Sequence, residues 1–340
     1  PLLGALSDSY GRRRVILISN FGLGLDYVLM ALAPDLWWLF AGRVISGISA
    51  ATVSTGFAYI SDVTPAEKRA ASFGMLGAAF GLGFVLGPAF GGVLGAIDPR
   101  LPFWIAAGMS LLNGMYGLFV LPESLPVERR VPFSIRRANP IGALNLLRSH
   151  SELSGLAVAK FLADLAHAVL PSVYVLYAGY RYQWDERAIG LALALVGVCS
   201  MVVQAGLIGP IVKRFGERSA MQFGLAMGVA GFATTGLAAP GWVSLLGIPL
   251  LALWGIASAS TNGLMTRRVS PTEQGQLQGA ISSIQGIASL FGPFLFTLTF
   301  AYFIRAGEHW HLPGAPFLLA ALLLAAAMVL AWRATGLQRT

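Results

Sequence analysis

Apolar stretches of about 20 residues, separated by short polar turns, run through most of this chain. A helix of that length spans the ~30 Å hydrocarbon core of a bilayer. Only 11% of the residues are charged, whereas soluble domains carry about 25% charged residues. The sequence therefore predicts an all-α membrane protein. The stretches of sufficient length are 14–33, 36–61, 70–95, 102–121, 153–177, 187–212, 219–238, 241–264, 277–303 and 314–332.

Lysines and arginines are distributed unevenly between alternate loops. Most of the 23 lie at 7–14, 62–69, 122–152, 213–218, 265–275 and after 333. The opposite loops hold only Arg100, Arg181, Arg187 and Arg305. The positive-inside rule then predicts a multi-pass membrane protein whose opening stretch, linker and C-terminus are cytoplasmic. We expect the membrane to be the inner (plasma) membrane. Because topology explains the net charge of +8, we expect no nucleic-acid partner.

An internal repeat divides the chain. "GALSDSYGRR" at 4–13 aligns with "GPIVKRFGER" at 209–218, and "LGPAFGG" at 86–92 aligns with "FGPFLF" at 291–296. The offset is 205 residues in both cases. Two similar halves joined by a polar linker are typical of secondary transporters.

The boundaries of the halves follow from the long polar stretch. We expect an N-terminal half over 1–121, a cytoplasmic linker over 122–152 and a C-terminal half over 153–340. The chain begins at Pro1, and little apolar sequence precedes the first basic cluster. We therefore expect that at least one spanning helix is missing from the N-terminus.

Three motifs carry a family resemblance. The loop pattern G-x-L-a-D-r-x-G-r-r is matched at 4–13, except for Ser9 in place of arginine. The pattern L-x-x-x-R-x-x-q-G-x-x-A-A is matched at 39–51, except for Ser46 in place of glutamine. The antiporter pattern G-x-x-x-G-P-x-x-G-G is matched by Gly83, Gly87, Pro88, Gly91 and Gly92. These stretches resemble the major facilitator superfamily, and within it most closely the tetracycline efflux group of twelve-helix drug/proton antiporters.

The resemblance implies two pseudo-symmetric six-helix halves, with the first helix and most of the second absent here. It also implies export of an amphiphilic, tetracycline-like drug in exchange for protons, with no cofactor. We expect a monomer whose partners are the drug, protons and the lipid bilayer.

Four charged residues are candidates for a cytoplasmic latch between the two halves. Asp8 and Arg12 are four residues apart, although Gly11 makes a simple helical pair uncertain. Asp8 could instead cap the N-terminus of a neighbouring helix. We expect Arg12 and Arg13 to reach Asp62 at the end of the next hairpin. The second-half copy has Lys213 in place of Asp8, so its latch should be weaker. The alternative is that the cluster only fixes topology.

Charged residues within the apolar stretches are candidates for a proton or substrate path, because burial in a bilayer is costly for charge. Asp26 and Arg43 are the candidates in the first half. In the second half, Asp164 and His167 share a helix face, and Lys160 lies one turn before Asp164. A buried structural ion pair without a transport role is the alternative.

Gly83, Gly87, Pro88, Gly91 and Gly92 lie in an apolar helix, where glycine permits close helix packing and proline removes a backbone hydrogen bond. Either a packing seam or a hinge accounts for them. Alternative functions are export of another metabolite or a sugar, a transport-inactive or receptor-like protein, and a membrane enzyme. The enzyme alternative is disfavoured because the four histidines show no metal-ligand pattern.

Overall fold

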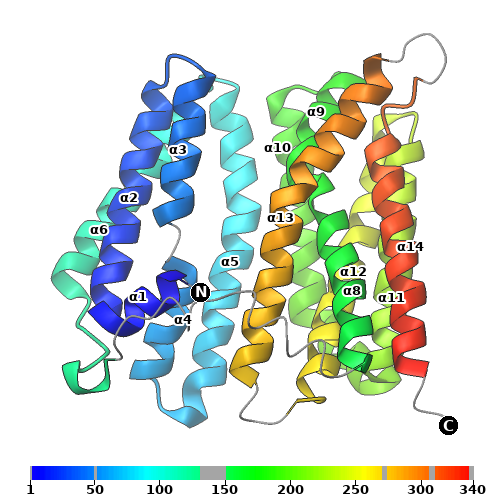
Figure 1. The fold of residues 1–340 in the computed structure, drawn as a ribbon. Helices are drawn as coiled ribbons and strands as arrows, with labels where there is room; N and C mark the ends of the chain where they lie inside the picture. Colours follow the sequence, from blue (N-terminus) through cyan, green and yellow to red (C-terminus); the bar gives the residue numbers. More distant parts are fainter. Residues whose placement is uncertain (1, 50–51, 131–150, 270–273, 306–310, 337–340) are drawn as a thin grey trace. The chain divides into compact units, whose positions relative to one another are not determined.

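The structure, a computed structural model, describes all residues except 1, 50–51, 131–150, 270–273, 306–310 and 337–340 (Figure 1). The described residues are helical and contain no strand. They include seven helical segments that are long and apolar enough to cross a membrane. The protein is thus an all-helical membrane protein. It divides into two compact units, Pro1–Asn139 and Pro140–Thr340. Ala50 and Ala51 of the second motif lie outside the described residues.

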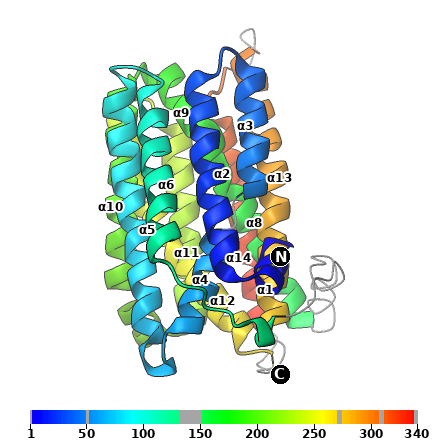
Figure 2. The same cartoon turned by 90° about the vertical axis from the view of Figure 1, so that its left-hand side faces the viewer.

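The first unit contains six α-helices in its described part. These are α1 (Leu2–Tyr10), α2 (Arg12–Leu32), α3 (Leu36–Ser49), α4 (Thr52–Val63), α5 (Ala66–Gly95) and α6 (Leu101–Val120), followed by a short 3-10 turn at Val127–Arg129. Helix α2 packs against α6 and α3 (Figure 2).

Glycines bring α2 and α6 together, as expected for helices packed in lipid. A Cβ atom at Gly24 would lie 2.6 Å from the side chain of Leu111, and one at Gly114 would lie 3.3 Å from the ring of Phe21. The two helix surfaces thus fit only because these positions lack side chains.

The second unit contains the remaining helices. These are α8 (Ser151–His167), α9 (Val169–Tyr182), α10 (Glu186–Val202), a π-helical turn (Val203–Leu207), α11 (Ile208–Leu237), α12 (Gly241–Thr266), α13 (Gln274–Arg305) and α14 (Ala315–Gly336). Helix α11 packs closely on α12, where Cβ atoms at Gly224 and Gly231 would lie 2.6 Å from the backbone of Ala257 and 2.8 Å from the side chain of Leu251.

Two predicted helices are divided differently in the structure. The stretch 153–177 is not one helix, because α8 ends at His167 and α9 begins at Val169. Pro171 explains the break, since it provides no N–H for the carbonyl of His167. The stretch 187–212 is interrupted by the π-helical turn at Val203–Leu207. The predicted turn at 213–218 is confirmed, because the chain departs from helical geometry at Gly216.

Gly11 and Gly216 have the positive φ angles found for glycine in the described residues, 100° and 76°. Their ψ angles are 149° and 159°, a region that essentially only glycine occupies. The two positions are separated by the 205-residue offset of the repeat. The repeat seen in the sequence is therefore also a repeat of backbone conformation.

Replacing either glycine with alanine should destabilise the protein, to different extents. Backbone strain alone costs about 1–3 kcal/mol, and Gly216→Ala should show only this cost because its surroundings are open. Gly11→Ala should lower the melting temperature further, since the new Cβ atom would contact the Glu123 carboxylate. Melting temperatures of the two detergent-purified variants test this order. A larger effect at Gly216 would contradict it.

Candidate functional site

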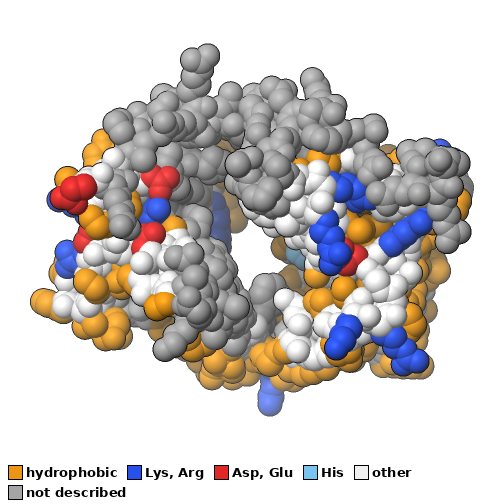
Figure 3. Space-filling view, turned by 90° about the horizontal axis from the view of Figure 1, so that it is seen from below, with side chains coloured by type: hydrophobic (Ala, Val, Ile, Leu, Met, Phe, Trp, Pro, Cys, Tyr) orange, Lys and Arg blue, Asp and Glu red, His pale blue; other side chains and the backbone are white. Residues whose placement is uncertain are grey.

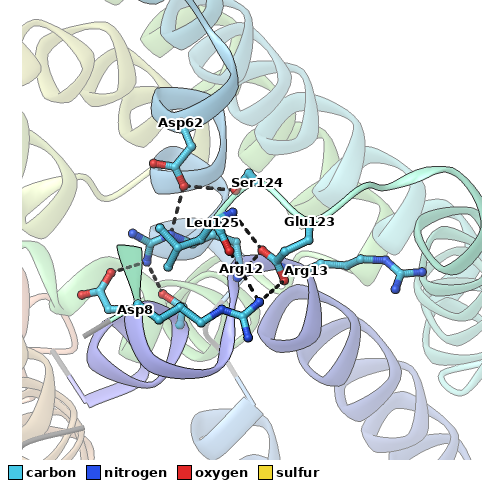
Figure 4. Close-up of polar contacts among 9 residues, drawn as sticks. Asp8, Arg12, Arg13, Asp62, Glu123, Ser124 and Leu125 are labelled. Atoms are coloured by element: carbon cyan, nitrogen blue, oxygen red, sulfur yellow. Dashed lines mark hydrogen bonds and ion pairs between the residues drawn. The ribbon is translucent and has the colours of Figure 1, made fainter. Parts of the chain in front are cut away.

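Arg12 is the centre of a polar cluster at the start of α2, formed with Ser7, Asp8 and Asp62 (Figure 4). Its Nη1 atom lies 2.5 Å from Asp8 Oδ1 and donates a hydrogen bond to Ser7 Oγ. Its Nε atom lies 3.3 Å from Asp62 Oδ2 at the end of α4. The Arg12 side chain is only 12% exposed. The predicted contacts of Arg12 with Asp8 and Asp62 are thus both present, and Gly11 does not prevent the first.

Glu123, which follows α6, caps α2 and was not predicted from the sequence. Its Oε1 accepts the backbone N–H of Arg12 at 2.9 Å and that of Arg13 at 3.4 Å. A carboxylate at this position satisfies N–H groups that have no partner within the helix, and it complements the helix dipole. The capping role considered for Asp8 therefore belongs to Glu123. Ser124 extends the cluster, because its hydroxyl donates to Asp62 Oδ2 at 3.0 Å.

Arg13 does not join Arg12 at Asp62, contrary to the expectation. Its Nη2 atom donates to the backbone carbonyl of Leu118 at 2.6 Å. Because Leu118 is in the last turn of α6, Arg13 holds the end of that helix. We therefore call Ser7, Asp8, Arg12, Asp62, Glu123 and Ser124 the Arg12 cluster.

The second unit contains an ion pair at the equivalent positions, with the charges exchanged. Glu217 Oε1 lies 3.1 Å from Arg267 Nη2. Glu217 and Arg267 are each offset by 205 residues from Arg12 and Asp62. Seen from the end at which the α1–α2 turn lies, charged side chains are visible on each unit, beside hydrophobic ones (Figure 3). The sequence already contained the evidence for this ion pair, because the 205-residue offset of the repeat pairs Arg12 with Glu217 and Asp62 with Arg267.

Gly263 of α12 makes room for the second ion pair. A Cβ atom there would lie 2.7 Å from Glu217 Oε1. The pair is more open than its counterpart, because the Arg267 side chain is 76% exposed, whereas that of Arg12 is 12% exposed. Lys213, the counterpart of Asp8, is exposed. Arg12 thus has two acidic partners, Asp8 and Asp62, whereas the structure pairs its counterpart Glu217 with Arg267 alone in the described residues.

Asp26 is buried in α2, with 1% of its surface exposed. It lies against α3, where a Cβ atom at Gly42 would be 2.7 Å from its Oδ1. Neither Asp26 oxygen makes a hydrogen bond that meets ordinary geometric criteria within the described residues. Arg43 follows Gly42 on the facing helix α3, but its side chain is exposed, and the structure shows no ion pair between Asp26 and Arg43 in the described residues.

Lys160 and Asp164 form an ion pair within α8, with Nζ 3.1 Å from Oδ1. Their side chains are 8% and 19% exposed. The second carboxylate oxygen, Oδ2, is buried and makes no hydrogen bond to the described residues. The sequence therefore predicted the pair correctly, and the structure adds a carboxylate oxygen that is left without a partner.

A pocket of about 120 Å³ lies beside this ion pair. Polar residues of three helices line it, together with Ala168 and two prolines: Asp164 and His167 of α8, Pro171 and Ser172 of α9, and Gln285, Ser289 and Pro293 of α13. Gly292 permits α13 to approach the α8–α9 break, since a Cβ atom there would clash with Ala168. The predicted residues Asp164 and His167 thus face a common pocket.

The antiporter pattern lies in α5, and Pro88 is inside the helix. A Cβ atom at Gly83, Gly87 or Gly91 would have no heavy atom of the described residues within 4 Å. Within the described residues of the first unit, the close helix contact expected for a packing seam is therefore not formed at these glycines. A hinge role is untested by this observation.

Comparison with known proteins agrees with this architecture. The family model of the Major Facilitator Superfamily matches residues 1–293 and 156–339. The tetracycline resistance protein, class C, of Escherichia coli is 39% identical over 88% of this chain and 76% of that protein. The class G protein of Vibrio anguillarum is 36% identical over 91% of this chain and 79% of that protein.

A solved structure is also similar. The human organic anion transporter MFSD10 has 25% sequence identity and a TM-score of 0.71, over 97% of this chain and 79% of that chain. The relatives and the fold are those of membrane transporters rather than enzymes. On the family match and the two-unit helical architecture, this chain belongs to the Major Facilitator Superfamily.

Proposed function

We propose that the protein is a proton-coupled exporter of an amphiphilic, tetracycline-like drug. The observation that carries the proposal is a pair of carboxylates in apolar helices, Asp26 and Asp164, each with an oxygen lacking a hydrogen bond to the described residues. Charge at the bilayer centre costs about 2.5–3.5 kcal/mol on insertion scales. A carboxylate that binds and releases a proton gives a physical reason for such costly groups.

The position of Asp164 supports a role in proton coupling. It lies about 11 residues after Leu153, where the candidate span Leu153–Tyr182 begins. At about 1.5 Å per residue this is ~16 Å, half of a ~30 Å core. Lys160 favours the charged carboxylate and burial disfavours it. A site balanced in this way can take up a proton in one conformation and release it in another.

The similarity to proteins named for tetracycline resistance supports the substrate class. We further propose that residues 1–121 and 153–340 are the two transporting halves, joined by a cytoplasmic linker at 122–152. In this proposal the protein acts as a monomer in the inner membrane, and the Arg12 cluster gates transport at the cytoplasmic side.

Cells that are sensitive to tetracycline provide the direct test. Expression of the protein, preceded by the N-terminal helices of a related resistance protein if the chain alone does not insert, should lower tetracycline accumulation severalfold. A protonophore should abolish this effect, because it dissipates the gradient that drives export. Unchanged accumulation with protein present in the membrane would overturn the substrate class. Export of organic anions instead would favour the substrate class of MFSD10.

A further inference from the structure

The pocket beside Asp164 contains two residues whose backbone carbonyls lack their usual helical donor. A proline has no N–H, so the carbonyl four residues before it loses its hydrogen bond. Pro171 and Pro293 line the pocket, and the carbonyls concerned belong to His167 and Ser289, which line it as well. A proline of α9 and a proline of α13 therefore each remove the helical hydrogen bond of one residue that lines this pocket.

Other residues that line the pocket also carry oxygens that can accept hydrogen bonds. Asp164 has a buried Oδ2 atom without a hydrogen bond to the described residues, and the side chains of Ser172 and Gln285 carry oxygens. Only the Oδ1 atom of Asp164 is paired, with Lys160. The carbonyl and carboxylate oxygens accept hydrogen bonds, whereas the hydroxyl and amide side chains both donate and accept them, so water, which does both, matches the lining of the pocket.

The volume of the pocket suits water molecules rather than a drug-sized ligand. Its volume of about 120 Å³ is well above the roughly 10–15 Å³ that one water molecule needs by this measure, so the pocket has room for several water molecules. Pockets that bind drug-sized ligands measure about 300–1,000 Å³. The pocket thus has the size of a small water cluster.

Trp254 of α12 holds the His167 ring beside the pocket. The two ring centroids lie 5.7 Å apart, with an interplanar angle of 45°. Trp254 is itself fixed, because it is only 9% exposed and packs on Phe232 at a centroid distance of 5.5 Å. A Cβ atom at Gly228 would lie 2.8 Å from the indole ring. The indole therefore has little freedom to move away from His167.

The charged groups that act on His167 come from its own helix. They are Asp164 and Lys160. Helix α12 has no charged residue, and α9, α13 and α14 each have one, in the last turn: Arg181, Arg305 and Arg333. Asp164 and Lys160 are thus the charged residues within two helical turns of His167 on α8.

We propose that this pocket is a water-filled proton site, distinct from the drug site, in which Pro171, Pro293 and Trp254 are positioning residues. The proton moves between water, a carboxylate oxygen of Asp164 and a ring nitrogen of His167, so only O–H and N–H bonds form and break. The carbonyls of His167 and Ser289 order the water. This inference rests on the proposed proton-coupled export and assigns the proton to one pocket.

Substitution of Pro293 tests the role of the freed carbonyl. Pro293→Ala supplies an N–H for the Ser289 carbonyl and should slow drug-driven proton movement roughly fivefold in proteoliposomes, the order expected for one lost acceptor. Drug binding should stay within twofold of the unsubstituted protein. Pro249→Ala is the matched control, because Pro249 lies inside α12 and does not line the pocket. Equal effects of the two substitutions would overturn the assignment.

Trp254 variants test how the histidine is positioned. Trp254→Leu should shift the pH midpoint of drug-driven proton movement by roughly one unit, whereas Trp254→Phe, which keeps a ring beside His167, should shift it less. His167→Ala should remove the shift that Trp254→Leu causes, because the indole acts through the imidazole. An unchanged pH midpoint in Trp254→Leu would contradict this role.

The same assay separates failure of this inference from failure of the proposed function. If Asp164→Asn stops proton movement but Pro293→Ala and Trp254→Leu leave it unchanged, coupling stands and the water-filled site is wrong. If no proton movement accompanies transport by the unsubstituted protein, proton coupling itself is wrong. Export driven by a sodium gradient at constant pH would show that the acceptors hold a metal cation, which also overturns the inference.

Discussion

Asp164→Asn is expected to abolish drug-driven proton movement, at least tenfold below the unsubstituted protein, while drug binding survives. Asparagine has nearly the shape of aspartate, but it neither binds nor releases a proton near neutral pH. The measurement uses proteoliposomes that contain a pH-sensitive dye, with a tetracycline gradient as the driving force. Asp164→Glu, which keeps a carboxylate, is the matched variant and should retain part of the movement.

Loss of Asp164 also leaves Lys160 without its ion-pair partner. Breaking a buried pair by removing one partner costs about 3–5 kcal/mol, so the single variant could lose activity through instability. The double variant Lys160→Met, Asp164→Asn removes both charges and should restore the melting temperature without restoring proton movement. Recovery of proton movement in the double variant would mean that Asp164 only neutralises Lys160.

A normal rate in Asp164→Asn would place the proton site elsewhere. Asp26 is then the first candidate, because it is buried and its oxygens make no hydrogen bond to the described residues. Asp26→Asn in the same proteoliposomes would decide between the two carboxylates. Each unit therefore contains one candidate carboxylate for proton binding, and the proteoliposome assay shows which of the two is needed for proton movement.

Much of the fold could be predicted from the sequence, because apolar length and turn residues decide where membrane helices begin and end. The helix over 241–264, for example, is observed as Gly241–Thr266. The break after His167 was missed although Pro171 signals it, because average hydropathy does not register the loss of one N–H group. The π-helical turn at Val203–Leu207 has no comparable sequence signal.

The Arg12 cluster was predicted in part, for reasons of sequence distance. Asp8 lies one helical turn from Arg12, so their pairing follows from local spacing. Glu123 is 111 residues from Arg12, and only the packing of α6 beside α2 brings it to the helix start. Arg13 was misassigned because adjacent residues of a helix point in different directions. Contacts between distant elements therefore needed the structure.

Neutralising Arg12 is the second substitution expected to have a large effect. Arg12→Gln should lower tetracycline export at least tenfold, since it leaves Asp8 and Asp62 without their shared partner. Asp8→Asn should also lower export strongly, because it removes charge with little change of shape. Membrane insertion should be intact in both variants, which immunodetection in isolated membranes can verify.

The second unit provides the matched control for Arg12. Glu217→Gln breaks the equivalent ion pair, but the Arg267 side chain is 76% exposed, and exposed pairs contribute little because water screens them. Export should therefore fall no more than about threefold in Glu217→Gln, and less still in Lys213→Ala. High salt on the cytoplasmic side should weaken the Glu217–Arg267 pair more than the Arg12 cluster, because the Arg12 side chain is only 12% exposed and is therefore screened less. Equal losses of export in Arg12→Gln and Glu217→Gln would show that burial does not set the importance of the two pairs, and the asymmetry inferred between the two halves would then be wrong.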